Sequence, residues 1–199
     1  MSTSPQERGR QMSTMYSIGQ MNQLADALEK SGFSVDDVTK LRSFAKLNEI
    51  KHVLCGYAKI VKVKHIIDCD ADPFVPNNWA VEEHIKGGQF EWDSAKVAIY
   101  LSKDQQSGKV IQGNYLHKEL KGQPVLNANV LDYLLVHPEL IPEDWKDKFV
   151  FFWGTIYRGS GGHLVVRCLH CHGDRWDWHY HWFDYDFNAD NPAAVSTSN

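Results

Sequence analysis

Apolar positions along the chain follow two different periods, and the change comes about a third of the way along. In residues 18–56 the apolar residues recur at intervals of three and four, which is typical of amphipathic helices. Gly32 and Gly56 stand where such helices would end, because glycine adopts the capping conformation without strain. We therefore expect a unit of short helices at residues 18–58, preceded by a disordered leader at residues 1–17.

Beyond residue 58 the pattern favours strands. The clearest signal is a three-stranded antiparallel meander at residues 149–157, 163–170 and 176–183. Further elements are expected as strands at residues 60–67, 89–92 and 96–101, and as short helices at residues 79–84, 114–120 and 127–136. Residues 184–199 are polar and predict a tail. The expected fold class is α+β: an N-terminal helical unit, then a mainly antiparallel β body (59–187) with inserted short helices and a C-terminal β-meander, and a flexible tail (188–199).

Composition narrows the functional classes. The chain has 199 residues and a formal charge of −4, which argues against a broad nucleic-acid surface and favours a protein or small-molecule partner. It contains no run of eighteen apolar residues, so we expect no membrane span. The first residues are polar and lack the apolar stretch of a secretory signal, which favours a cytoplasmic location. In a reducing compartment the four cysteines are expected to be free thiols.

Several segments resemble a family of uncharacterised bacterial proteins. They are VKHIIDCDADPFVPNNW, VEEHIKGGQFEWD, KELKGQPVLNANVLDYLL, PELIPEDWK and FVFFWGTIYR. Together they span the chain from about residue 60 onward. The family has no established activity, so the resemblance implies relatedness and no mechanism. Its members vary in the segment matching residues 169–172, which makes the cysteine–histidine pattern described next particular to this chain.

The segment from Cys168 to His172 has the form Cys-x-x-Cys-His, the attachment pattern of a c-type haem. Haem attachment of this kind requires export, and no signal is present, so haem is disfavoured. Zinc is a better candidate, because thiolate, imidazole and carboxylate groups are its usual ligands. No second Cys-x-x-Cys completes a zinc ribbon, and a solvent-exposed, histidine-rich sheet face explains the residues equally well. The candidate metal ligands are Cys168, His170, Cys171, His172, Asp177, His179 and His181.

A two-residue turn at Gly173–Asp174 would fix the register of the last hairpin. Cys168 then lies opposite His179, and His170 lies opposite Asp177. Because side chains alternate along a strand, the histidines share one face and the aromatic residues the other. The aromatic face carries Trp176, Trp178, Tyr180 and Trp182. Such a stripe is most often core, but where it is exposed it can stack on sugars or bases.

A second candidate site follows the strand predicted at residues 60–67. Asp68, Asp70 and Asp72 are spaced carboxylates, and hard oxygen ligands suit Mg²⁺ or Mn²⁺. With His65 or His84 as a base, they would make a metal-dependent hydrolase or phosphoesterase. Aspartates beside a proline are also ordinary turn residues. Ser160 lies in a glycine-rich hairpin tip rather than in a nucleophile elbow, which argues against a serine hydrolase.

No nucleophile elbow, phosphate loop or complete metal set stands out in the sequence. We therefore favour a non-catalytic binding or interaction module. The alternatives are a metal-dependent hydrolase centred on the aspartates and a zinc-binding protein built on the C-terminal hairpin.

Overall fold

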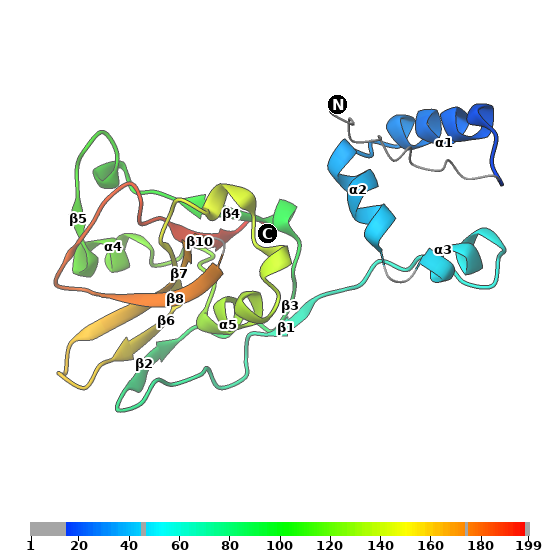
Figure 1. The fold of residues 1–199 in the computed structure, drawn as a ribbon. Coiled ribbons are helices and arrows are strands. Elements are labelled where there is room, and N and C mark those ends of the chain that lie inside the picture. Colours follow the sequence, from blue (N-terminus) through cyan, green and yellow to red (C-terminus); the bar gives the residue numbers. More distant parts are fainter. Residues whose placement is uncertain (1–14, 45–46, 174, 198–199) are drawn as a thin grey trace, which may run out of the picture. The chain divides into compact units, whose positions relative to one another are not determined.

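The computed structural model describes residues 15–44, 47–173 and 175–197 (Figure 1). The chain divides into two compact units, Met1–Lys62 and Val63–Asn199. The fold class is α+β, as expected, with helices first and a strand-rich body after them. Nearly all of the predicted leader lies outside the described residues.

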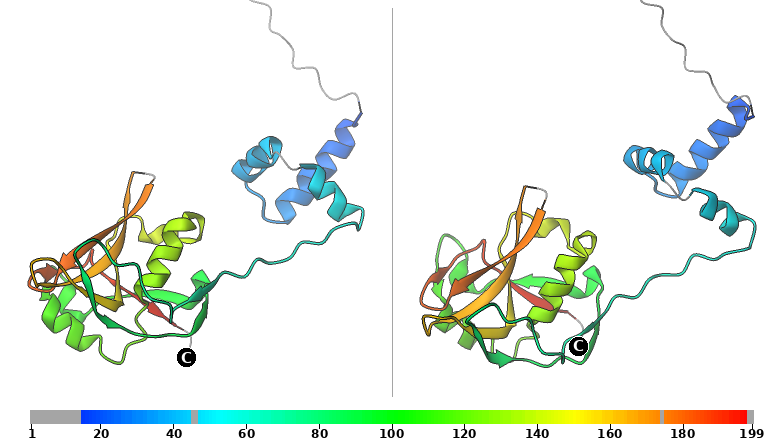
Figure 2. Two further views of the ribbon diagram at one scale, coloured as in Figure 1. Left: turned by 90° about the horizontal axis from the view of Figure 1, so that it is seen from below. Right: turned by 60° about the horizontal axis from the view of Figure 1, so that its bottom comes forward.

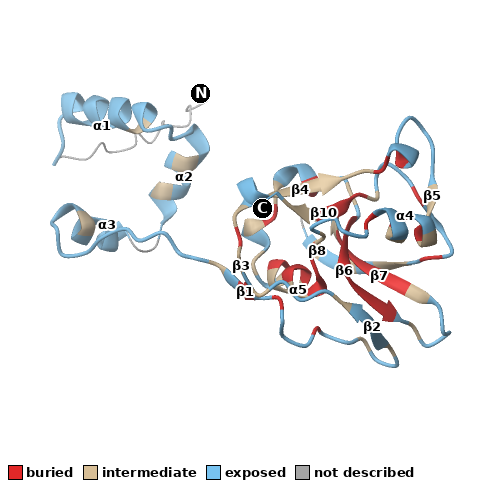
Figure 3. Ribbon diagram, turned by 180° about the vertical axis from the view of Figure 1, so that it is seen from behind, coloured by how far each residue is buried: buried red, intermediate tan, exposed pale blue. Residues whose placement is uncertain are grey.

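The described residues of the first unit form three short helices, α1 (Ile18–Lys30), α2 (Val35–Ser43) and α3 (Leu47–Leu54). Ser17 and Ser34 begin the first two through capping boxes, in which the serine hydroxyl accepts a backbone N–H and the third helical residue bonds back to the serine. None of the described residues in these helices is buried (Figure 3). The apolar faces of these helices therefore form no buried hydrophobic core among the described residues.

The described residues of the body include ten strands. They are β1 (Ile66–Asp68), β2 (Ala80–His84), β3 (Gln89–Glu91), β4 (Val97–Tyr100), β5 (Ile111–Gln112), β6 (Val150–Arg158), β7 (Leu164–His172), β8 (Arg175–Trp182), β9 (Asp186–Phe187) and β10 (Ala193–Ser196). The helices are α4 (Gly113–Glu119), α5 (Ala128–Val136) and short 3₁₀ turns at Ser94–Lys96, Lys103–Gln105, Pro138–Leu140 and Glu143–Trp145.

Six strands make the main sheet. Its order is β4-β10-β6-β7-β8, and β2 also pairs with β6. The pairings are antiparallel except for the parallel contact of β10 with β6. Strands β6, β7 and β8 form the predicted meander. Two further pairs, β1 with β3 and β5 with β9, lie outside this sheet.

Helices α5 and α4 pack on opposite faces of the main sheet (Figure 2). Val150 and Phe152 of β6 point toward α5, whereas Phe151 and Trp153 point toward α4, because side chains alternate along a strand. Both faces of β6 are therefore buried, and residues 150–157 read as a continuous apolar run instead of an alternating one.

Three expectations about secondary structure are wrong. Residues 79–84 were expected as a helix, but Ala80–His84 forms β2, because pairing with β6 overrides a weak helical pattern. Only Ile66 and Ile67 of the strand expected at 60–67 belong to a strand, since the residues before them meet no partner strand in the described body. The interpretation of 188–199 as a flexible tail fails at Ala193–Ser196, which is β10 and lies between β4 and β6.

A buried ion pair lies within the apolar core of the body. Arg167 of β7 is 1% exposed, and its guanidinium donates to both carboxylate oxygens of Asp132 on α5 at 3.1 and 2.6 Å. Burial alone would lower the pKa of Arg167, but the hydrogen bonds that Arg167 donates to Asp132 raise it overall, so the charge is retained. The guanidinium also lies 4.5 Å from the ring centre of Trp178 and 5.2 Å from that of Phe74.

Among the described residues, no helix combines the length and the apolar character that crossing a membrane requires.

Candidate functional site

The register of the last hairpin is the one expected from the sequence. Cys168 pairs with His179, His170 with Asp177, and Cys171 with Trp176. The two faces of the hairpin therefore divide as predicted, with histidines on one and aromatic residues on the other. Asp174, in the predicted turn, lies outside the described residues.

The side chains on the histidine face differ in how deeply they are buried. Cys168 is 1% exposed, and burial raises the pKa of its thiol to about 12. His170 packs edge-on against Phe149, with ring centres 4.6 Å apart. Burial lowers the pKa of His170, and the neighbouring His179 and His172 lower it further. Nδ1 of His170 is buried and has no hydrogen-bond partner among the described residues.

The candidate zinc ligands do not form a metal site as they stand. Among the described residues, no three histidine, cysteine, aspartate or glutamate side chains are placed to hold one ion. Cys168 and Cys171 are three positions apart on one strand, so their side chains lie on opposite faces of the hairpin. That placement also does not fit two bonds to a single haem.

Two of the candidate ligands instead bond the backbone of their own strand. The carboxylate of Asp177 accepts the backbone N–H of Trp178 at 2.8 Å. Nδ1 of His179 donates to the carbonyl oxygen of Tyr180 at 2.8 Å. Strand β8 is the last in the sheet order, so these side chains satisfy polar groups on an outer strand.

The aspartate segment forms an anchored turn. Oδ1 of Asp68 accepts the backbone N–H of Asp70 at 3.0 Å, and Oδ1 of Asp70 accepts that of Gly88 at 2.8 Å. Nδ2 of Asn129 donates to the carbonyl oxygens of Asp68 and Ala71 at 2.9 and 2.8 Å. Asp72 is exposed. The hydrogen bonds that the Asp68 and Asp70 carboxylates accept hold the turn together, and among the described residues these aspartates belong to no group that could hold a metal ion.

His84, a candidate base, ties this turn to the main sheet. Its Nε2 donates to the carbonyl oxygen of Cys69 at 3.1 Å, and its Nδ1 lies 2.8 Å from the Thr155 hydroxyl. The same hydroxyl oxygen accepts the backbone N–H of Ala128 at 3.0 Å, at the start of α5. A neutral imidazole with its proton on Nε2 satisfies this whole chain of bonds. His65, the other candidate base, bonds the Tyr133 hydroxyl through Nδ1 at 3.0 Å.

The aromatic stripe is divided into two halves. Trp176 and Trp178 pack against the core beneath α5. Trp178 also stacks on Arg167 and touches Phe74 and Trp79 with its ring edges. This half of the predicted stacking surface is therefore structural.

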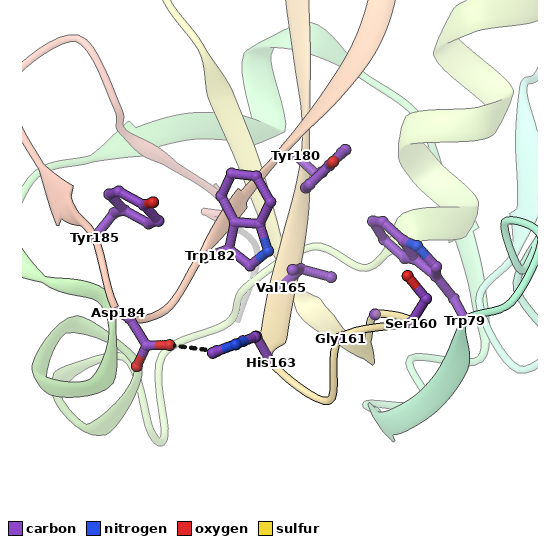
Figure 4. Close-up of a pocket in the computed structure, with 10 residues that line it drawn as sticks. Trp79, Ser160, Gly161, His163, Val165, Tyr180, Trp182, Asp184 and Tyr185 are labelled. Atoms are coloured by element: carbon purple, nitrogen blue, oxygen red, sulfur yellow. Dashed lines mark hydrogen bonds and ion pairs between the residues drawn. The ribbon is translucent and has the colours of Figure 1, made fainter.

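The other half lines a cleft of about 540 Å³. Figure 4 shows Trp79, Tyr180 and Trp182 arranged around Val165. Tyr180 stands perpendicular to Trp79, with ring centres 4.9 Å apart at 90°, and nearly perpendicular to Trp182, at 5.2 Å and 79°. Tyr185 extends the surface beyond Trp182, 5.4 Å away at 44°. The volume lies within the range of about 300–1,000 Å³ that small-ligand pockets occupy.

Polar groups stand at the rim of this cleft. Nδ1 of His163 donates to a carboxylate oxygen of Asp184 at 2.8 Å. Ser160 lies on the opposite side, beside Trp79, in the glycine-rich turn between β6 and β7 (Figure 4). The His163 ring points toward Asp184, and no hydrogen bond joins it to Ser160 among the described residues. The rim therefore offers hydrogen-bonding groups without an activated serine.

Sequence reasoning identified Tyr180 and Trp182 but missed the rest of the cleft. Trp79 precedes β2, and its place beside Tyr180 depends on the pairing of β2 with β6. Asp184 and Tyr185 lie in the stretch interpreted as a tail. The only available signal was the continuation of the aromatic pattern past residue 182 into Phe183 and Tyr185.

No protein-family model, curated protein or solved structure matches this chain.

Proposed function

We propose that this protein is a non-catalytic binding module whose ligand occupies the cleft formed by Trp79, Tyr180, Trp182 and Tyr185. The observation that carries the proposal is the division of the stripe on β8. Tyr180 and Trp182 share a face with Trp176 and Trp178 but do not belong to the main core under α5. Tyr180 packs on the small cluster of Ala128, Tyr157 and Val165, and it lines an open cleft together with the exposed Trp182. Large aromatic surface left open beside hydrogen-bonding groups is characteristic of ligand sites.

The chemistry of the rim favours binding over turnover. The His163–Asp184 pair orients an imidazole, but no nucleophile bonded to that imidazole is present among the described residues. Both side chains are well exposed, at 60% and 56%. Water therefore weakens their electrostatic effect on a bound molecule. The alternative, a metal-dependent hydrolase at Asp68, Asp70 and Asp72, is less well supported, because Asp68 and Asp70 accept backbone hydrogen bonds within their own turn.

The test is a binding screen read out on the tryptophan indole N–H signals by NMR. The probes are methyl β-glucopyranoside, adenosine, choline and inorganic phosphate, each raised to about 10 mM to detect weak binding. We expect at least one probe to shift the indole signals of Trp79 and Trp182 and to leave those of the buried Trp145 and Trp153 in place.

Two variants locate the site. Trp182→Ala should abolish the shift at Trp79, whereas Tyr115→Ala, which removes an exposed ring on α4 outside the cleft, should retain it. Every probe should be recovered unchanged by mass spectrometry. The proposal fails if no probe moves the Trp79 and Trp182 signals, or if a probe is converted by the wild-type protein and not by Trp182→Ala.

A further inference from the structure

Resting on the proposed function, we infer that the ligand is a neutral sugar, held by stacking on Trp182 and by hydroxyl contacts along the rim. Three features of the cleft lead to this class. They are the shape of the aromatic surface, the kind of hydrogen-bonding groups beside it and the charges that it lacks.

The aromatic surface consists of two exposed rings, Trp182 and Tyr185, and of Tyr180, whose ring stands almost perpendicular to Trp182. Trp182 is 36% exposed and Tyr185 is 57% exposed, and their rings are tilted by 44°. Tyr180 is supported from behind by Trp79. A pyranose presents an apolar face of C–H groups and a polar rim of hydroxyls. Such a ring can lie flat on Trp182 while Tyr180 limits its position on one side.

The polar groups match hydroxyls. Nδ1 of His163 donates to Asp184, and in the tautomer protonated at Nδ1 alone the Nε2 atom is an acceptor that has no partner in the described part of the chain. The Asp184 carboxylate is an acceptor as well, although Asn114 approaches its second oxygen at 3.4 Å. The Ser160 hydroxyl both donates and accepts. The indole N–H groups of Trp79 and Trp182 add donors, so the cleft offers both donors and acceptors, and sugar hydroxyls can pair with either kind.

The charges disfavour two other classes. Among the described residues no lysine or arginine lines the cleft, and the chain carries a formal charge of −4, so a phosphorylated ligand gains no ion pair from the described lining. A quaternary ammonium group needs aromatic faces on several sides of it. The ammonium group of choline carries no hydrogen-bond donor, so it would leave the Asp184 carboxylate and the Ser160 hydroxyl at the rim unpaired.

The experiment compares sugars with other stacking ligands. The probes are the methyl glycosides of glucose, galactose, mannose and N-acetylglucosamine, the disaccharides cellobiose, lactose and chitobiose, and, as competing classes, adenosine and choline. Affinity is measured by isothermal titration and by the shift of the Trp79 indole signal. We expect at least one sugar to bind more tightly than adenosine and choline.

Variants then test the two kinds of contact. Trp182→Ala should weaken sugar binding at least about tenfold through loss of the stacking ring, and Asp184→Asn about fivefold to tenfold through loss of an ionised acceptor. Tyr115→Ala should bind as the wild type does. Binding of adenosine or choline without any sugar would overturn the inference and leave the proposed function standing. Absence of binding by every probe would overturn both, and sugar binding that is insensitive to Trp182→Ala would overturn the placement of the site.

Discussion

Two halves of one strand, β8, have the same sequence pattern and opposite structural roles. Trp176 and Trp178 pack on the main core beneath α5. Tyr180 packs only on a small cluster with Val165 and Tyr157, and it lines an open cleft together with Trp182. All four side chains emerge from the same face at the same period of two. The pattern along a strand therefore determines which residues share a face, and the segments that cross that face determine whether they become core or site.

The boundary between the halves is set by residues from distant parts of the chain. Asp132 on α5 holds Arg167, and Arg167 stacks on Trp178. Trp79 then contacts both Trp178 and Tyr180, at ring-centre distances of 6.4 and 4.9 Å. The covered half thus supports the open half through these packed side chains.

Removing one partner of the buried ion pair should have the largest effect on stability. Asp132→Ala leaves the charged Arg167 without its carboxylate in a site that is 1% exposed. Because the Asp132 side chain is itself 30% exposed, we expect a loss near the lower end of the range for broken buried pairs, about 3 kcal/mol in the free energy of urea unfolding. The double variant Asp132→Leu with Arg167→Met should lose less. Equal losses in the two proteins would show that the pair does not act as a unit.

The next comparison sets Trp178 against Trp182. Trp178→Ala should lower the free energy of unfolding by about 2 kcal/mol, less than for a fully buried tryptophan, because its ring packs on the core and on Arg167 but stays partly exposed. Trp182→Ala should change it by less than about 1 kcal/mol, because no such cover is lost. Urea unfolding followed by circular dichroism measures both. If the two variants were destabilised equally, the division of the stripe into core and site would be wrong.

A smaller effect is expected on the opposite face of the hairpin at acid pH. The pKa of His170 is lowered by burial and by His179 and His172, so the unfolded chain takes up a proton more readily there. The resulting stability is present above pH 6.5, the ordinary pKa of histidine, and is lost as the pH falls through the lower pKa of the folded state. The midpoint of thermal unfolding should thus fall less steeply below that pH in His170→Asn than in the wild type. Parallel curves for the two proteins would contradict the assignment.

The smallest effect concerns the reactivity of the four cysteine thiols. Burial raises the pKa of Cys168 to about 12 and that of Cys69 to about 11. Both thiols should therefore resist iodoacetamide at pH ~8, since the thiolate is the reactive form. Cys55 is exposed and Cys171 is partly so, and both should be alkylated first. Peptide mass spectrometry during the reaction gives the order, and early modification of Cys168 would show that this part of the sheet opens.

The sequence predicts local geometry well where one short turn fixes it. The pairing of Cys168 with His179 follows from the hairpin and the period of two, and it is confirmed. The sequence does not reveal β10, because Ala193 and Ala194 have short side chains and follow loop-forming residues, and their burial comes from β4 and β6 on either side. Only some of the residues that line the cleft were predicted, because the others reach it through strand pairings distant in the sequence. Tyr180 and Trp182 belong to the hairpin, whereas Trp79, Asp184 and Tyr185 arrive through pairings that the local pattern does not encode.

The side-chain bonds along β8 bear on how this protein behaves at high concentration. An outer strand with free backbone groups can recruit a strand from another molecule and begin edge-to-edge aggregation. On β8, the Asp177 carboxylate accepts a hydrogen bond from the backbone N–H of Trp178, and His179 donates one to the carbonyl oxygen of Tyr180. These two backbone groups are therefore not free to pair with a strand from another molecule. A strand that carries three tryptophans at the border of its sheet is thereby made a poor template for growth.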